Sequence, residues 1–227
     1  MADYGNTVRP GMARRNQGAR ILAEKGNTEG ELTLPQKSEV LKIEAGIRNR
    51  KTEVAYTVND RGESTKITIS SSKNRTRVNG TLIKEGDIVV HNHPAFGDGK
   101  NIASRVGISL SDADIMSSIK HNAKGVRASY PTYQYSLTHG GKGWGVSAQQ
   151  AGAEWRSTYQ REQARISAQY NRQIAKMESD YRAKKISVDD YNKRIGVMND
   201  RFNAVASHRA TKALADKYGW KYTRRKN

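Results

Sequence analysis

Two histidines separated by one residue are the strongest chemical signal in the sequence. His91 and His93 follow the apolar run Ile88–Val90 and come directly before Pro94. Side chains two positions apart on a β-strand project from the same face, so both imidazoles can point at one ion. Imidazole nitrogens are among the ligands that zinc takes in proteins. The pattern therefore predicts a metal site at the end of a strand.

A third ligand is expected at the start of the next helix. A catalytic zinc has three protein ligands and keeps one position open for water, so two histidines leave the site incomplete. Asp114 falls in the first turn of a helix predicted to begin after Ser111, because Ser111 is a favourable N-cap and acidic residues are favourable in a first turn. Asp114 is therefore the candidate third ligand.

The two patterns together resemble the signature of a metallopeptidase family. His91-Asn-His-Pro94, followed by Ser111-x-Ala-Asp114, is similar to the motif of the JAMM zinc metallopeptidases, which have the MPN (JAB) fold, and most of all to the forms in bacterial and phage RadC-like proteins. The resemblance covers residues 36–138, about half of the chain. It implies an α+β fold with a mixed sheet and a zinc-dependent hydrolase.

The resemblance also implies a role for each matching residue. His91, His93 and Asp114 would bind zinc. Glu53 stands where the family has an upstream glutamate and would act as the general base on a water molecule, while Ser111 would donate a hydrogen bond to the developing oxyanion. The implied reaction is hydrolysis of an amide or isopeptide bond in a protein substrate or conjugate by metal-activated water.

Three features of the sequence leave alternatives open. Twenty residues, 94–113, separate His93 from Asp114, which is longer than usual in the family, so Gly97–Gly107 is interpreted as an insertion. It would be either a loop that shapes the substrate site or a sign that the site has lapsed. Asp112, preceded by Ser109, is a rival ligand with the same spacing, although the neighbours of Asp114 match the family better. The rival general bases are Glu44, Glu63 and Glu85.

The elements around these residues predict an α+β domain over residues 35–146. A helix is expected to begin at Pro35, and Asn59–Gly62 is expected to turn the first two strands into a hairpin. The expected strands are 53–58, 64–69, 88–90, 126–130 and 133–137. The resemblance identifies this domain as MPN/JAB-like.

The ends of the chain differ from this domain in composition. Residues 1–34 are rich in Gly and Arg and predict a basic flexible arm. Residues 147–227 have apolar positions at helical spacing and predict an antiparallel helical hairpin or coiled coil, followed by a basic tail. Ser187 is expected to cap the second helix and Gly219 to end it. The apolar stripes are expected to form the seam between the two helices.

Composition limits the chemistry and indicates the kind of partner. The net charge is +18 and the isoelectric point is about 10.1, which favours anionic partners such as nucleic acid or an acidic protein surface. The chain has no cysteine, so disulfides, thiol catalysis and thiolate metal sites are excluded. No apolar run is long enough to span a membrane and the first residues do not resemble a secretory signal. A protein of the cytoplasm, or of a phage particle, is expected.

Two functions fit these observations. The first is an active JAMM-type zinc peptidase or isopeptidase whose basic helical part docks it on a partner. The second is a catalytically lapsed JAB-fold protein of virion assembly, which contacts other subunits or nucleic acid. No known nucleic-acid-binding motif is present. The remaining histidines and the three tryptophans are interpreted as structural: His121, His139, His208, Trp144, Trp155 and Trp220.

Overall fold

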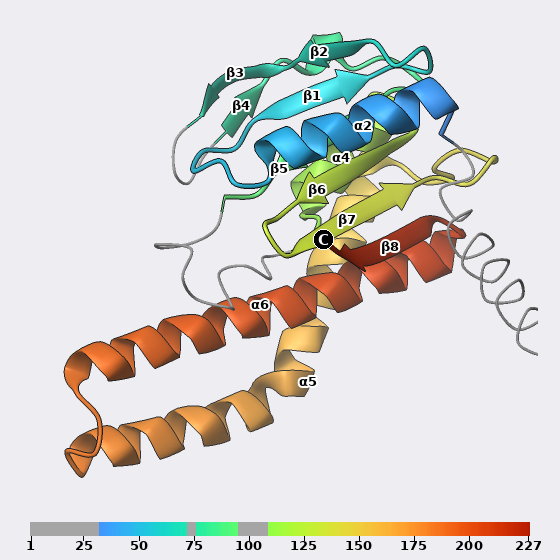
Figure 1. Cartoon of the computed structure of the whole chain (residues 1–227). Coiled ribbons are helices and arrows are strands. Elements are labelled where there is room, and N and C mark those ends of the chain that lie inside the picture. The colour runs from blue at the N-terminus through green and yellow to red at the C-terminus, as the bar shows by residue number, and fades with distance from the viewer. Residues whose placement is uncertain (1–31, 72–75, 95–108) are drawn as a thin grey trace, which may run out of the picture. The chain divides into compact units, whose positions relative to one another are not determined.

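The structure is a computed structural model, and it describes residues 32–71, 76–94 and 109–227 (Figure 1). Nearly all of the predicted basic arm, residues 1–31, lies outside the described residues. The predicted insertion Gly97–Gly107 lies outside them as well. The described elements begin with a helix and end with a strand.

Six strands form one mixed sheet in the order β2-β1-β5-β6-β7-β8, in which only β5 and β6 run parallel. A separate two-stranded sheet pairs β3 with β4. The strands of the large sheet are β1 (Ala55–Val58), β2 (Ser64–Lys66), β5 (Ile88–Asn92), β6 (Gly125–Ser129), β7 (Tyr133–Thr138) and β8 (Lys221–Lys226). The small sheet consists of β3 (Thr68–Ser71) and β4 (Thr76–Val78), and the short 3-10 helix η2 (Gly80–Leu82) follows it.

Helices cover both faces of the large sheet. In Figure 1, α2 (Leu34–Ile47) lies on one face and α4 (Asp112–Lys120) on the other. The long helices α5 (Ala148–Arg182) and α6 (Val188–Tyr218) follow as a pair. The predicted α+β class, mixed sheet and C-terminal helical pair are therefore confirmed. None of the described helices is long and apolar enough to cross a membrane.

The parallel pairing of β5 and β6 fixes the place of α4. Two parallel neighbours cannot be joined by a hairpin, so the chain must cross over one face of the sheet before it returns. Helix α4 is part of this crossover, and a crossover helix begins near the carboxyl end of the strand before it. The first turn of α4 is thereby brought beside the end of β5.

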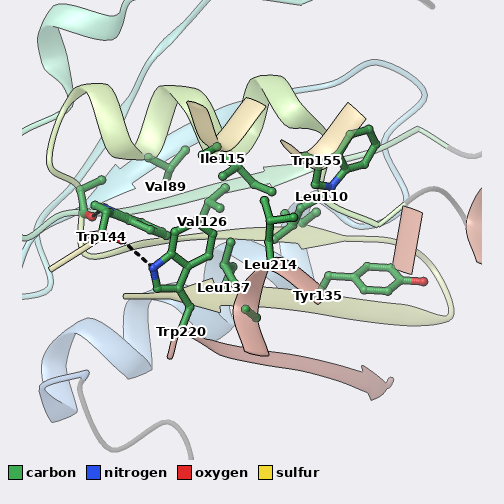
Figure 2. Close-up of a cluster of buried hydrophobic side chains, with 14 of the residues drawn as sticks. Val89, Leu110, Ile115, Val126, Tyr135, Leu137, Trp144, Trp155, Leu214 and Trp220 are labelled. Atoms are coloured by element: carbon green, nitrogen blue, oxygen red, sulfur yellow. Dashed lines mark hydrogen bonds between the residues drawn. The ribbon is translucent and has the colours of Figure 1, made fainter. Parts of the chain in front are cut away.

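The main hydrophobic core lies on the α4 side of the sheet (Figure 2). It joins side chains from the sheet, α4, α5 and α6, so the helical pair and the sheet share one core. Labelled members are Val89, Leu110, Ile115, Val126, Tyr135, Leu137, Trp144, Trp155, Leu214 and Trp220. The three tryptophans are buried and each indole N–H donates to a buried oxygen, which confirms their predicted structural role.

The opposite face of the sheet holds a buried ion pair beneath α2. Arg127 of β6 donates to both carboxylate oxygens of Glu44, at 2.8 and 3.3 Å, and both side chains are almost completely buried. Removing one partner of such a pair leaves an uncompensated charge in the interior, which costs about 3–5 kcal/mol. The pair therefore fixes α2 to the centre of the sheet.

The predicted hairpin at Asn59–Gly62 is present, but its second strand is divided. The Asn59 side chain accepts hydrogen bonds from the backbone of Arg61 and Glu63, and Gly62 has a positive φ of 80°. A Cβ on Gly62 would lie 2.8 Å from the carbonyl oxygen of Pro35, so glycine also permits the contact with α2. The expected strand 64–69 breaks at the buried Ile67, and the chain leaves the large sheet to form β3.

The predicted basic tail is wrong, because residues 221–226 form strand β8. All six residues pair with β7. The Tyr222 hydroxyl bonds to Ser109 and to His208, and the Arg224 guanidinium lies 4.1 Å from the centre of the Tyr133 ring. Edge strands commonly carry Lys and Arg because these residues discourage further strand pairing. That composition is the reason the segment looks like a tail.

The helical pair has a packed base and an exposed arm. Buried residues of α5 lie between Ala151 and Thr158, and those of α6 lie between Ala204 and Ala215. Across residues 159–203 no side chain is fully buried. The arm is held by the predicted seam, in which Tyr170 packs on Phe202 and Tyr181 on Tyr191, with ring centres 4.6 and 5.1 Å apart. Ser187 and Gly219 cap α6 as predicted.

We predict that the arm can be shortened without loss of the fold. Deleting residues 168–178 and 192–202 removes eleven residues, about three turns, from each helix and keeps the remaining seam in phase. The variant should keep the near-ultraviolet circular dichroism of the three core tryptophans and a cooperative thermal transition. Deletion of 147–227 should abolish both, because it removes Trp155, Leu214, Trp220 and β8 from the core. Loss of the tryptophan signal in the shortened variant would contradict this division.

Candidate metal centre

Three side chains from β5, its exit and α4 converge on one point. The Nε2 atoms of His91 and His93 lie 2.8 Å apart, and they lie 3.4 and 3.7 Å from the carboxylate oxygens of Asp114. One ligand atom of each residue lies within 4.8 Å of the other two. The three side chains that the sequence singled out are therefore together and can hold a metal ion.

Strand alternation explains why the two histidines share a face. In β5, Ile88, Val90 and Asn92 point to the α2 side, while Val89 and His91 point to the α4 side, and His93 continues this alternation. His91 pairs with Ala55 on one neighbour and Ala128 on the other, so small residues flank it in the sheet. Its side chain is only 3 % exposed. The strand thus presents a rigid imidazole to the N-terminus of α4.

Asp114 is oriented by the cap of its own helix. Ser111 donates to Asp114 Oδ2 from its backbone N–H, at 2.7 Å, and from its hydroxyl, at 2.8 Å. The Ser111 hydroxyl in turn accepts from the Asp114 N–H, which completes a capping box. Burial raises the pKa of Asp114, but the charges of His91 and His93 and these hydrogen bonds outweigh burial and hold the pKa below its usual value. The carboxylate is therefore the form at neutral pH.

Tyr130 contacts His93 at Nδ1, the ring nitrogen other than the one that faces Asp114. The Tyr130 hydroxyl lies 2.9 Å from His93 Nδ1, and the two rings meet edge to face with centres 5.1 Å apart. When the hydroxyl accepts from Nδ1–H, the lone pair of His93 is left on Nε2, which is the atom that faces Asp114. Such partners commonly fix the tautomer and orientation of metal-binding histidines. Tyr130 was not predicted as a site residue, although it directly follows β6.

Asn92, between the two histidines, anchors the segment that carries Glu53. Its side chain is completely buried, accepts from the Val54 N–H at 2.8 Å and donates to the carbonyl of Thr52 at 3.2 Å. These bonds hold residues 52–54 against the end of β5. Glu53 is half-buried, and it lines the same cavity as His91, His93, Ser111 and Asp114. Asn92 could not be selected from its local pattern, because a single polar residue after an apolar run is common.

The ligand set fits zinc. In a tetrahedral site with zinc–nitrogen bonds of about 2.0–2.1 Å, two ligand atoms lie about 3.3 Å apart. In the structure the two Nε2 atoms lie 2.8 Å apart, His91 Nε2 lies 3.4 Å from Asp114 Oδ1, and His93 Nε2 lies 3.7 Å from Asp114 Oδ2. Two imidazoles and one carboxylate are a common ligand set of catalytic zinc, and they leave a fourth position open. The cavity beside them, of about 360 Å³, has room for a water molecule or a substrate group at that position.

The rival ligand Asp112 has a different partner. Its carboxylate accepts from Arg156 Nη1 of α5 at 2.6 Å. Ser109, the serine of the rival motif, is completely buried and bonds to Ser207 and Tyr222. Neither residue lines the cavity with the three converging side chains. The rival motif therefore joins α4 to the helical pair.

The rival glutamates lie elsewhere too. Glu44 is paired with Arg127 on the α2 side of the sheet. Glu63 lies in the Asn59–Gly62 hairpin, where hydrogen bonds from Asn59 and Arg61 lower its pKa. Glu85 accepts from the Asn122 side chain. Of the four glutamates considered, Glu53 alone lines the cavity.

The other three histidines have structural contacts. His121 caps the end of α4 and packs on Gly80. His139 lies beside Trp144, and His208 bonds to the Tyr222 hydroxyl. Burial lowers the pKa of His121 and of His208, with nearby basic side chains adding to the effect. These contacts agree with the structural role predicted for them.

Neither known protein families, nor curated proteins, nor solved structures give a match to this chain.

We predict that the wild-type chain binds one zinc ion and that His91→Ala/His93→Ala loses it, because two of the three donors are removed. Metal content is measured by mass spectrometry after reconstitution at neutral pH, with folding checked by circular dichroism. His121→Ala is the matched control, since it removes an imidazole outside the site, and it should keep the ion. Absence of zinc from the reconstituted wild-type chain would contradict the proposed metal site.

We further predict that Tyr130→Phe weakens zinc binding by about 10- to 100-fold, because it leaves His93 Nδ1 without its partner while the ring remains. Affinity is measured by competition with a chromophoric chelator. Tyr133→Phe is the control, since its ring packs on Arg224 in the same turn region. Equal affinities of the Tyr130 variant and the wild type would exclude the positioning role.

Proposed function

We propose that the chain is a JAMM-type zinc-dependent peptidase or isopeptidase with an MPN (JAB) fold. The observation that supports it most strongly is the convergence of His91, His93 and Asp114 in a cavity that Glu53 and Ser111 also line. Two imidazoles and a carboxylate, with a second carboxylate from Glu53 in the same cavity, are the parts that hydrolysis by activated water requires. Histidines with a chance HxH spacing would not be expected to share a cavity with Asp114 of α4 and with Glu53, which comes just before β1.

The arrangement of elements also supports the MPN assignment. The His-x-His pair lies at the end of a central strand, and the aspartate lies in the first turn of the crossover helix after it. Helices lie on both faces of the mixed sheet. These are the elements that the family resemblance implied. The long helical pair and β8 are additions to that plan.

The chain's own residues supply a general base and a positioned ligand. His91, His93 and Asp114 would hold a zinc ion, which when bound would lower the pKa of a coordinated water from about 15.7 to about 7. Glu53 takes the proton from the attacking water and later delivers it to the leaving amine. Both transfers use the same carboxylate, so Glu53 must lie close to the open coordination position.

Ser111 has two tasks in this proposal. In the resting state its hydroxyl donates to Asp114 Oδ2 and holds the ligand in place. During the reaction the hydroxyl rotates and donates to the oxyanion of the tetrahedral intermediate, as the family resemblance implies. The backbone N–H of Ser111 keeps its own bond to Asp114, so the ligand stays oriented while the hydroxyl moves.

One observation favours the alternative, a catalytically lapsed assembly protein. The arm, residues 159–203, has no fully buried side chain and extends the helices well beyond the shared core. Residues 151–227 carry 18 basic and eight acidic side chains, a net charge of +10. Such a surface suits an acidic protein or nucleic acid. In this alternative, the shortened arm loses the partner while zinc binding is unchanged.

We predict that Glu53→Gln keeps zinc and loses hydrolysis by about 10²–10⁴-fold, because the amide cannot accept a proton. The substrate is a mixture of quenched fluorescent peptides, and bound zinc is measured on the same samples. Glu85→Gln is the control, since its carboxylate bonds to Asn122 away from the cavity. Full activity of the Glu53 variant would exclude it as the base. No hydrolysis by a zinc-loaded wild type would favour the assembly role.

A further inference from the structure

The cavity that holds the metal ligands also has an apolar side. Six apolar residues line it beside the polar group, and we call this part the apolar recess. They come from β1, β5, β6, the β3–β4 sheet and the segments around it. The apolar recess consists of Ala55, Ile67, Val78, Ile83, Val89 and Val126. Five of these residues are buried and Val78 lies at the surface.

Open space against buried aliphatic side chains is unusual in a protein interior, which packs as densely as an organic crystal. Ligand sites are the common exception, because they combine an apolar wall with a few polar groups that orient the ligand. Here the polar groups include the candidate metal ligands, Glu53, Ser111 and Ser117. The cavity therefore joins a reactive centre to a place for an apolar group.

A second observation points to a ligand in the same cavity. Thr76 lines it at the start of β4, and the side-chain oxygen of this residue is buried and has no hydrogen-bond partner within the described part of the chain. Buried hydroxyl groups nearly always have a partner. A backbone N–H or carbonyl of a bound peptide would supply one, beside the apolar recess.

A neighbouring cavity offers space into which a longer ligand would extend. It has a volume of about 710 Å³, and it shares Val78 and Ser117 with the metal cavity. It continues along α4 past Met116 towards Ala148 at the start of α5. A polypeptide can thus pass from the metal ligands along α4, whereas a small free metabolite would use the first cavity alone.

We propose that the apolar recess binds an aliphatic side chain of a peptide substrate, next to the bond that is cleaved. The inference rests on the proposed peptidase function and specifies its substrate class. A cavity of about 360 Å³ must also hold the metal, its water and the carbonyl group of the substrate, so the remaining space suits a side chain of the size of valine or leucine. Ser117 lines both cavities, so a much larger side chain at this position would fill the space where they meet.

The test compares two hydroxamates that bind zinc through the same group. Acetohydroxamic acid carries a methyl group, and 4-methylpentanohydroxamic acid carries a branched aliphatic chain. Each is titrated calorimetrically into the full, zinc-loaded chain. We expect the branched compound to bind at least about tenfold more tightly, because it removes more apolar surface from water. Ser117→Phe should abolish the preference for the branched compound but keep acetohydroxamate binding. Ser117→Ala, which frees space, should preserve the preference.

The outcomes separate this inference from the function on which it rests. If the wild type binds the two compounds equally, the proposed role of the apolar recess is wrong, whereas binding of both compounds still supports the zinc site. A preference that persists in a folded, zinc-loaded Ser117→Phe variant places the aliphatic group elsewhere and also overturns it. If neither compound binds to the zinc-loaded chain, the open coordination position is absent, and both the substrate class and the peptidase function are excluded.

Discussion

The structure depends on strand β5 being covered on both faces. Alternate side chains of this strand face α2 and α4, so each must fit the residues that cover its own face of the sheet. His91 and His93 project to the α4 side, while Asn92 between them is buried on the α2 side and binds the backbone of residues 52–54. A shift of one residue would exchange these roles, bury the histidines beneath α2 and release the Glu53 segment. The register of β5 therefore positions both the candidate metal ligands and Glu53.

The third ligand depends on a second constraint, the parallel pairing of β5 with β6. This pairing requires a crossover and brings the first turn of α4 beside the end of β5. Helix N-termini favour negative charge, so a carboxylate in that turn is stabilised both by the helix and by the two imidazoles. Ser111 adds the hydrogen bonds that select one orientation of Asp114. The long interval between His93 and Asp114 does not prevent this, because the pairing of β5 with β6 and the cap of α4 fix both ends.

These two constraints explain which parts could be predicted from the sequence. The His91/His93 pair, the Ser111 cap and the strands on either side follow from local periodicity and capping, which act within a few residues. Asn92, Tyr130 and the partners of Asp112 and Glu44 could not be predicted, because each contact joins residues tens of positions apart and depends on the order of strands in the sheet. The prediction for the segment that forms β8 was wrong for another reason. Its Lys and Arg residues suit an edge strand as well as a flexible tail, and only the contacts of Tyr222 and Arg224 distinguish the two.

The same long-range contacts connect the basic C-terminal strand to the metal ligands. Asn227 follows β8 and donates to the carbonyl of Tyr130 at 2.6 Å, and its own N–H donates to Thr132 at 2.9 Å. The turn that it holds carries the Tyr130 hydroxyl to His93. A ligand's orientation thus rests on a tyrosine whose turn is held by the last strand of the sheet.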